Sequence, residues 1–97
     1  FDWRDDGSGR ARYLGFAQAR ELAALPGAVA KYDKVKEAPY IKYTDTDGVP
    51  HVVWYDDARS TAAKLALTAR LRLRGIALWR LGMEDPALWQ LIGRREE

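Results

Sequence analysis

The stretch of residues 51–89, HVVWYDDARSTAAKLALTARLRLRGIALWRLGMEDPALW, decides the fold class. It begins with an aromatic, β-branched run, passes through two aspartates into an alanine-rich helix predicted over 58–73, and then enters a short apolar run at 76–79. A strand, a crossover helix and a second strand form the repeating unit of parallel α/β folds, which bind ligands where strands end. One such unit closes neither a barrel nor a doubly wound sheet. We therefore expect the chain to be a piece of a larger structure.

The helix predicted over 58–73 has the pattern of a helix packed on a sheet. Asp56 or Asp57 is placed to cap its first free N–H groups. Its apolar residues form one broad stripe, made of Ala62, Leu65, Ala66, Ala69 and Leu73 and widened by Leu67 and Leu71. Gly75 is expected to end the helix in the left-handed conformation. The run from Ile76 to Trp79 is apolar without alternation, which is typical of a buried parallel strand.

The residues before this stretch predict a strand end, a loop and a short helix. The aromatic start FDW leads into a polar, glycine-containing loop at residues 5–9. Apolar residues at helical spacing predict a helix over residues 14–25, which Pro26 and Gly27 stop.

A hairpin is expected in the middle of the chain. Residues 28–43 have extended character, and the turn signal TDTDG at residues 44–48 separates two aromatic or β-branched runs. Residues 40–43 and 51–55 should therefore pair as antiparallel strands. The last helix is predicted over residues 86–92, where Asp85 supplies the cap and Pro86 the first helical position.

Composition bounds the function. Hydrophobic residues make up 47% and charged residues 31% of the 97 residues, as in ordinary soluble domains. A net charge of +2 is too small to imply a nucleic-acid partner. The chain has no cysteine, and its one histidine, His51, makes no zinc cluster. No apolar run approaches the ~20 residues of a membrane-spanning helix. We expect no metal, no cofactor, no nucleic acid and no membrane span.

Large aromatic residues are the clearest candidates for ligand contact. They recur along the whole chain: Trp3, Tyr13, Tyr40, Tyr43, Trp54, Tyr55, Trp79 and Trp89. Sugar rings stack on such side chains, but for any single ring a place in the core is the favoured interpretation. Trp79 is the exception. It ends the predicted buried strand, where ligands of parallel folds bind, so the two interpretations are balanced there.

Paired acids and clustered arginines have structural explanations. The acids fall at predicted turns or helix starts, where capping is favoured over acid–base catalysis: Asp2, Asp5, Asp6, Asp45, Asp47, Asp56, Asp57, Glu84 and Asp85. Asp45, Asp47 and Gly48 resemble the start of a calcium loop, but the glutamate that closes such a loop is absent. Arg70, Arg72 and Arg74 alternate with leucines, which favours a solvated helix face over nucleic-acid binding.

Residues 38–82 resemble the C-terminal part of the family 18 glycoside hydrolases, the chitinase-like and spore-cortex-lytic-like enzymes. The motif is a Tyr-Asp-Asp sequence before a Ser-x-x-x-Lys helix, followed by a Gly-hydrophobic-Trp strand. It is matched by Tyr55, Asp56, Asp57, Ser60 and Lys64, and by residues 75–79. The opening FDW is similar to the end of the seventh strand in bacterial members.

The resemblance implies a fold, a reaction and site residues. The fold is a (β/α)8 TIM barrel, of which this chain would supply an α+β insertion at residues 4–54 with an antiparallel hairpin. Residues 55–97 would add the last helix, strand and final helix. The implied reaction is retaining hydrolysis of a β-linked N-acetylglucosamine polymer, chitin- or peptidoglycan-like, outside the cell or in its envelope. Implied substrate-binding residues are Trp79, Trp3, Tyr55 and Asp57.

The catalytic residues of that family are not in this chain. Its Asp-x-x-Asp-x-Asp-x-Glu signature, which holds the catalytic acid, occurs nowhere in the sequence. Two hypotheses follow: a fragment of a family 18-like enzyme that is not catalytically complete by itself, or a stand-alone carbohydrate-binding or protein-interaction module. A fragment would expose apolar helix surface and strand edges, so we also expect a homodimer or a strand-exchanged assembly.

Overall fold

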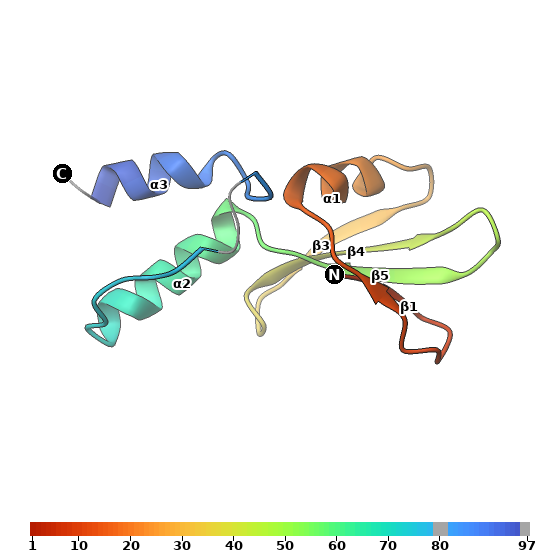
Figure 1. Cartoon of the computed structure of the whole chain (residues 1–97), viewed down its shortest axis with the longest axis horizontal. Helices are drawn as coiled ribbons and strands as arrows, with labels where there is room; N and C mark the ends of the chain where they lie inside the picture. The colour runs from red at the N-terminus through yellow and green to blue at the C-terminus, as the bar shows by residue number, and fades with distance from the viewer. Residues whose placement is uncertain (79–81, 96–97) are drawn as a thin grey trace.

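The structure is a computed structural model that describes residues 1–78 and 82–95. Its elements are β1 (Asp2–Arg4), β2 (Ala11–Arg12), α1 (Phe16–Ala23), β3 (Val29–Asp33), β4 (Ala38–Thr44), β5 (Pro50–Trp54), α2 (Ala58–Arg70) and α3 (Leu88–Arg95). The strands form one antiparallel sheet in the order β2-β1-β5-β4-β3 (Figure 1). The predicted α+β class is confirmed. The described residues form no closed barrel.

The predicted hairpin is β4 paired with β5. Tyr43 lies opposite His51, and Tyr40 lies opposite Trp54. At the turn, Asp45 accepts hydrogen bonds from the backbone N–H groups two and four residues ahead, at 2.9 Å each. Gly48 has a φ of 80°, a left-handed conformation that glycine adopts at no steric cost. The turn residues therefore set the register that the sequence predicts.

The sheet is wider than the sequence predicts. The extended run at residues 28–43 is broken into β3 and β4 by a turn at residues 34–37, where Glu37 takes a φ of 51°. The loop at residues 5–9 returns as the short strand β2. Strand β1, at the start of the chain, pairs with β5, the second strand of the hairpin. Such distant pairing leaves no local sequence signal.

The core lies between the sheet and α1, which covers one face (Figure 1). Its buried residues are Leu14, Ala19, Ile41, Tyr43 and Val53. The helix predicted over residues 14–25 is shorter in the structure. It starts at Phe16, whose backbone N–H donates to the Met83 carbonyl at 2.9 Å. Gly27, with a φ of 80°, lies in the turn after it.

Helix α2 begins as predicted and ends differently. Asp57 is its N-cap and accepts a 2.8 Å hydrogen bond from the Ser60 backbone N–H. The prediction that Gly75 ends the helix in the left-handed conformation is wrong, because Arg72 takes that position with a φ of 56°. The Leu73 N–H then donates to the Thr68 carbonyl at 3.0 Å, a helix-ending bond of the Schellman type.

Replacing Arg72 with glycine is expected to stabilise the fold by about 0.5–1 kcal/mol, because an L-residue pays a steric cost in the left-handed region and glycine does not. The measurement is the midpoint of urea unfolding. Arg74→Gly is the matched control, since Arg74 has no positive φ and glycine there is expected to leave the midpoint unchanged or lower it. A lower midpoint for Arg72→Gly would contradict the assigned helix end.

Residues 76–78 form no strand in the structure, contrary to the predicted parallel strand over 76–79. A parallel strand takes its hydrogen bonds from neighbours on either side, and the described residues supply no parallel neighbour. Ile76 and Leu78 are accordingly exposed. Trp79 lies outside the described residues. The last helix is α3, which begins two residues after the predicted start at Pro86.

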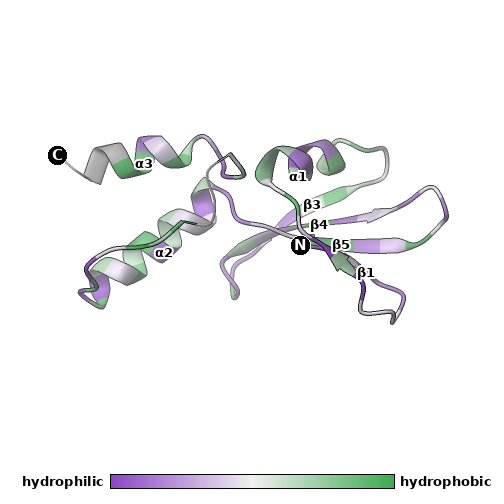
Figure 2. Cartoon of the chain, in the orientation of Figure 1, coloured by the Kyte–Doolittle hydropathy of each residue, from purple (hydrophilic) through white to green (hydrophobic). Residues whose placement is uncertain are grey.

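The molecule is elongated, with extents of 49 × 22 × 21 Å. The sheet with α1 forms one half, and α2 with α3 forms the other (Figure 1). Hydrophobic and hydrophilic residues alternate along α2 rather than forming an all-apolar helix (Figure 2). Each helix in the described part of the chain is too short or too polar to pass through a bilayer.

Candidate functional site

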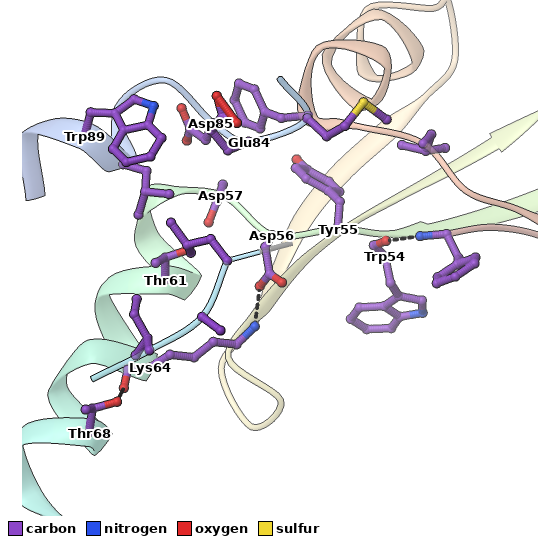
Figure 3. Close-up of a pocket in the computed structure, with 18 of the residues that line it drawn as sticks. Trp54, Tyr55, Asp56, Asp57, Thr61, Lys64, Thr68, Glu84, Asp85 and Trp89 are labelled. Atoms are coloured by element: carbon purple, nitrogen blue, oxygen red, sulfur yellow. Dashed lines mark hydrogen bonds and ion pairs between the residues drawn. The ribbon is translucent and has the colours of Figure 1, made fainter. Parts of the chain in front are cut away.

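An open cavity of about 640 Å³ lies between the sheet, helix α2, the segment of residues 73–78 and the segment of residues 83–89 (Figure 3). Aromatic side chains supply much of its wall: Phe1, Tyr13, Phe16, Trp54, Tyr55 and Trp89. Charged groups lie among them at Asp56, Asp57, Lys64, Glu84 and Asp85. Aromatic walls with a few polar groups are typical of small-ligand sites.

Tyr55 and Asp57, two of the predicted site residues, both line this cavity. They follow directly after β5, so the strand end positions them together. The Tyr55 ring lies 6.3 Å from the Phe16 ring, centre to centre, and packs against the core. Burial, and then the nearby Asp57 carboxylate, raises the pKa of the Tyr55 hydroxyl. Tyr55 is therefore a neutral hydrogen-bonding group at neutral pH.

Asp57 serves the helix as well as the cavity. Its carboxylate accepts the Ser60 N–H, and the Ser60 hydroxyl accepts the Asp57 N–H at 2.9 Å. The reciprocal pair satisfies two backbone groups at the start of α2. The capping role fixes the Asp57 carboxylate in one place at the cavity wall.

Asp56 and Lys64 form the polar floor of the cavity (Figure 3). The Lys64 Nζ lies 2.8 Å from Asp56 Oδ1, and the Ser60 hydroxyl donates to the same oxygen at 2.9 Å. Both charged side chains are more than half exposed, so the pair adds little to stability. Its charges are available to a ligand. The Ser-x-x-x-Lys spacing thus places Lys64 one helical turn beyond Ser60, over the same carboxylate.

Asp85 holds the opposite wall. One of its carboxylate oxygens accepts the Ala58 N–H at 2.8 Å, and the other accepts the Ala87 N–H at 3.0 Å. The segment also receives the Phe16 N–H at the Met83 carbonyl. The starts of all three described helices therefore meet on residues 83–87. These bonds are what positions Trp89 across the cavity from Lys64 (Figure 3).

Trp3 lies outside this cavity, on the face of the sheet that α1 leaves open. Its side chain is 45% exposed, and its ring lies 6.3 Å from that of Phe1. Phe1 exchanges backbone hydrogen bonds with Trp54, which places both on the open face. Trp54 stacks on Tyr40, with ring centres 4.8 Å apart. Trp3, Phe1, Trp54 and Tyr40 form the open aromatic face, which runs into the cavity at Phe1 and Trp54.

Trp54 belongs to the aromatic residues noted in the sequence but is not among the four expected substrate-binding residues. The signal for it was present: Tyr40 and Trp54 become partners once the hairpin register is set by the TDTDG turn. Trp79, which the strand-end position and the family resemblance together indicate, lies outside the described residues. The structure thus brings Tyr55 and Asp57 together, and leaves Trp3 on the adjoining open face.

A buried charge cluster lies on the other side of the sheet, the side that α1 covers. The His51 Nδ1 lies 2.7 Å from Asp2 Oδ1, and its Nε2 lies 2.8 Å from Asp45 Oδ2. The Tyr43 hydroxyl donates to Asp2 Oδ2 at 2.5 Å, and the Arg12 Nε donates to the same oxygen at 3.2 Å. Asp2, which is 2% exposed, thus has a partner for each oxygen.

The cluster shifts the pKa values of His51, Asp2 and Tyr43. Burial acts to lower the pKa of His51, but the hydrogen bonds to Asp45 and Asp2 outweigh it and raise that pKa. Burial opposes the shift of Asp2 too, where hydrogen bonds from Tyr43 and His51 lower the pKa. Burial and the hydrogen bond to Asp2 raise the pKa of Tyr43 to about 12. A carboxylate at each ring nitrogen favours the imidazolium form of His51, in which both nitrogens donate.

The described part of the chain contains no arrangement of side chains suited to hold a metal ion. No group of three or more His, Cys, Asp or Glu side chains there is arranged around an ion position. The Asp45 carboxylate, from the calcium-like turn, is occupied by His51 and by backbone N–H groups. No sequence pattern indicates the charge cluster around His51, because Asp2 lies 49 residues and Asp45 lies 6 residues away from it in the chain.

Comparison with known proteins finds glycosidases. The cortical fragment-lytic enzyme of Bacillus subtilis (strain 168) is 39% identical over 95 residues, which are 95% of this chain and 22% of that enzyme. The human di-N-acetylchitobiase is 41% identical over 54 residues, 56% of this chain and 14% of that protein. No family model matches the chain.

Solved structures agree with the sequence relatives. The spore cortex-lytic enzyme SleL of Bacillus megaterium QM B1551 has a TM-score of 0.84 at 39% identity, covering 95% of this chain and 22% of that one. A chitinase of Chromobacterium violaceum ATCC 12472 has a TM-score of 0.79 at 35% identity, covering 89% of this chain and 27% of that one. The chain is homologous to glycosidase-type proteins. The relatives that match nearly all of this chain are much longer, and the chain spans about a fifth of their length.

Proposed function

We propose that this chain is the C-terminal part of a family 18-like glycoside hydrolase and forms one wall of a site for an N-acetylglucosamine polymer of the chitin or peptidoglycan type. The observation that carries the proposal is the continuous match to the spore cortex-lytic enzyme SleL in both sequence and backbone. The cavity lies within the matched residues and is walled by aromatic rings, as a sugar-binding surface requires.

The residues that line the cavity would contribute different contacts to a bound sugar. Tyr55, Trp54 and Trp89 supply flat apolar contact for sugar rings, and Asp56 with Lys64 supplies hydrogen-bonding groups. Trp79 would add the floor beneath the reacting sugar, and Asp57 a fixed carboxylate. The acid that protonates the leaving group would come from outside this chain. In the substrate-assisted route of this family, the substrate's own acetamido oxygen attacks the anomeric carbon.

The proposed domain division is residues 4–54 as the α+β insertion and residues 55–97 as the last barrel helix, strand and final helix. The sheet with α1 and the pair α2 and α3 form the two halves of the molecule, in keeping with this division (Figure 1). Exposed apolar residues follow one another at the end of α2 and in the segment after it, where we expect the rest of a barrel to pack: Leu67, Leu71, Leu73, Ile76 and Leu78. The last three of them also line the cavity. In a full barrel, residues 76–79 would gain the parallel neighbours that form a strand.

A place outside the cytoplasm or in the cell envelope belongs to the same proposal. It is supported by the relatives whose names refer to the spore cortex. The expected homodimer or strand-exchanged assembly stays a prediction for the chain on its own.

A stand-alone carbohydrate-binding or protein-interaction module is the second candidate. The observation that favours it is the open aromatic face, where Phe1 is 54% and Trp3 is 45% exposed. A module of this kind would bind sugar on the face and not in the cavity. Trp3→Ala would then weaken binding more than a change at Trp89, and the enzyme-fragment proposal expects the reverse.

Trp54→Ala and Trp79→Ala are each expected to weaken binding of the N-acetylglucosamine tetramer by about tenfold, because each removes a stacking ring worth roughly 1.4 kcal/mol. Isothermal titration calorimetry measures the affinity. Tyr32→Ala is the matched control, since Tyr32 is an aromatic residue that does not line the cavity. Thermal melting checks that each variant is folded. Absence of binding by the unchanged protein at millimolar tetramer would refute the proposed function.

A further inference from the structure

A second hollow, of about 390 Å³, lies at the β1–β2 edge of the sheet. Three arginines from the hairpin of β1 and β2 line it, Arg4, Arg10 and Arg12, and this hairpin projects from the sheet (Figure 1). Its base is the charge cluster described above, with Asp2, Tyr43, Asp45 and His51. Neither the relatives' names nor the proposed catalytic chemistry assigns this hollow a role.

The charges of the hollow balance except for one. Arg4 pairs with Asp6, with the Nε 3.1 Å from Oδ2. Asp2 is paired with Arg12 and His51, and Asp45 with His51. Within the described residues, the Arg10 guanidinium has no hydrogen bond or ion pair. A cation without a partner at the rim of a hollow is placed to attract an anion.

Arg12 is held in position by a buried carboxylate. Its Nε donates to Asp2, whose side chain is 1% exposed, while the Arg12 side chain is 68% exposed. Asp2 engages the guanidinium through Nε, so the terminal nitrogens are not needed for this anchor. A guanidinium fixed in this way binds a planar carboxylate with two parallel hydrogen bonds and loses little side-chain entropy.

This edge of the sheet also borders the aromatic cavity. Phe1 and Tyr13 line the cavity, and their chain neighbours Asp2 and Arg12 line the hollow. Successive residues of a strand point to opposite faces, so the two sites lie back to back across the strand edge. A branched ligand, with a sugar chain on one side and a charged side group on the other, fits this arrangement.

We infer that Arg10 and Arg12 form a subsite for a carboxylate group carried by the glycan, such as that of a peptide attached to an amino-sugar polymer. The inference rests on the proposed function and adds to it the residues that would favour a carboxylate-bearing glycan over neutral chitin within the proposed substrate class. Arg10 supplies the uncompensated charge, and Arg12 supplies the oriented fork.

The test compares three ligands on the protein that contains this chain. They are a disaccharide muropeptide with free peptide carboxylates, the same muropeptide with those carboxylates amidated, and the N-acetylglucosamine tetramer. Arg10→Gln is expected to weaken binding of the free muropeptide by about tenfold, which corresponds to one charge-assisted hydrogen bond, and to leave the other two ligands unchanged.

Two further variants sharpen the result. Arg74→Gln is the control for net charge, because Arg74 lines neither hollow, and it should leave all three affinities unchanged. Arg12→Lys keeps the charge but loses the fork, so it should weaken only the free muropeptide, and Arg10→Gln decides the matter if Arg12→Lys does not fold.

Equal affinity for free and amidated muropeptides, or an unchanged affinity in Arg10→Gln, would overturn the subsite. If either result were obtained and Trp54→Ala still weakened binding of the tetramer, the subsite would be refuted and the proposed function would stand. If the unchanged protein bound none of the three ligands, the proposed function itself would be refuted.

Discussion

Replacing Asp2 with alanine is expected to lower the free energy of unfolding by about 3–5 kcal/mol, the largest effect of any single substitution considered. The Asp2 carboxylate is buried and accepts hydrogen bonds from Tyr43, His51 and Arg12. Removing it leaves the His51 Nδ1 and the Tyr43 hydroxyl without their hydrogen-bond partner in a largely buried site, while the His51 Nε2 keeps Asp45. It also removes the side-chain bonds that link β1 to Tyr43 and His51 of the β4–β5 hairpin. Urea unfolding followed by circular dichroism measures the change.

The matched control is Asp6→Ala, on the same β1–β2 hairpin. Asp6 forms an exposed ion pair with Arg4, so its loss is expected to leave the unfolding midpoint close to that of the unchanged protein. If Asp2→Ala also unfolded at an unchanged midpoint, the buried cluster would not be what joins the N-terminal strand to β5.

Stability is expected to depend on pH on both sides of a maximum that lies between pH 3.8 and 6.5, the ordinary pKa values of the acids and of histidine. The folded-state pKa of His51 is raised, so its contribution is complete below 6.5 and is lost as pH rises through the folded value. The pKa values of Asp2 and Asp45 are lowered, so their contribution is present above 3.8 and is lost as pH falls.

Unfolding midpoints measured from pH 3 to pH 9 test this dependence. His51→Gln is the informative variant, because glutamine retains hydrogen bonding but does not titrate. It is expected to flatten the decline on the alkaline side and to leave the acid side in place. An alkaline decline of equal size in the variant would show that another group causes it.

Local structure was predictable where the interactions that determine it lie within one short segment. The TDTDG turn and the two β-branched runs around it led to the β4–β5 hairpin, and Asp57 led to the start of α2. The turn of the hairpin and the cap of the helix each depend on hydrogen bonds between residues at most four positions apart. The end of α2 was predicted wrongly, because a helix pattern does not show that Arg72, and not Gly75, takes the left-handed position.

The candidate site was predictable only in part. Tyr55 and Asp57 were selected from one motif and line one cavity, because the end of β5 and the start of α2 are adjacent in the chain. Asp85 and Trp89 join them from the other side through the bond between Asp85 and the Ala58 N–H. The partner lies 27 residues away, so no local pattern indicates the contact.

The sequence by itself determined the central hairpin and the capped start of α2, because turn chemistry and capping act over a few residues. The α+β class and the likeness to glycosidases came from the resemblance of residues 38–82 to known enzymes and not from these local patterns. Only the tertiary structure decided that Asp2, His51 and Asp45 form one charge cluster, and that a hollow with an unpaired arginine adjoins it. Pairing β1 with β5 brings residues 2 and 51 together, and contact at that separation is set by packing of the whole sheet.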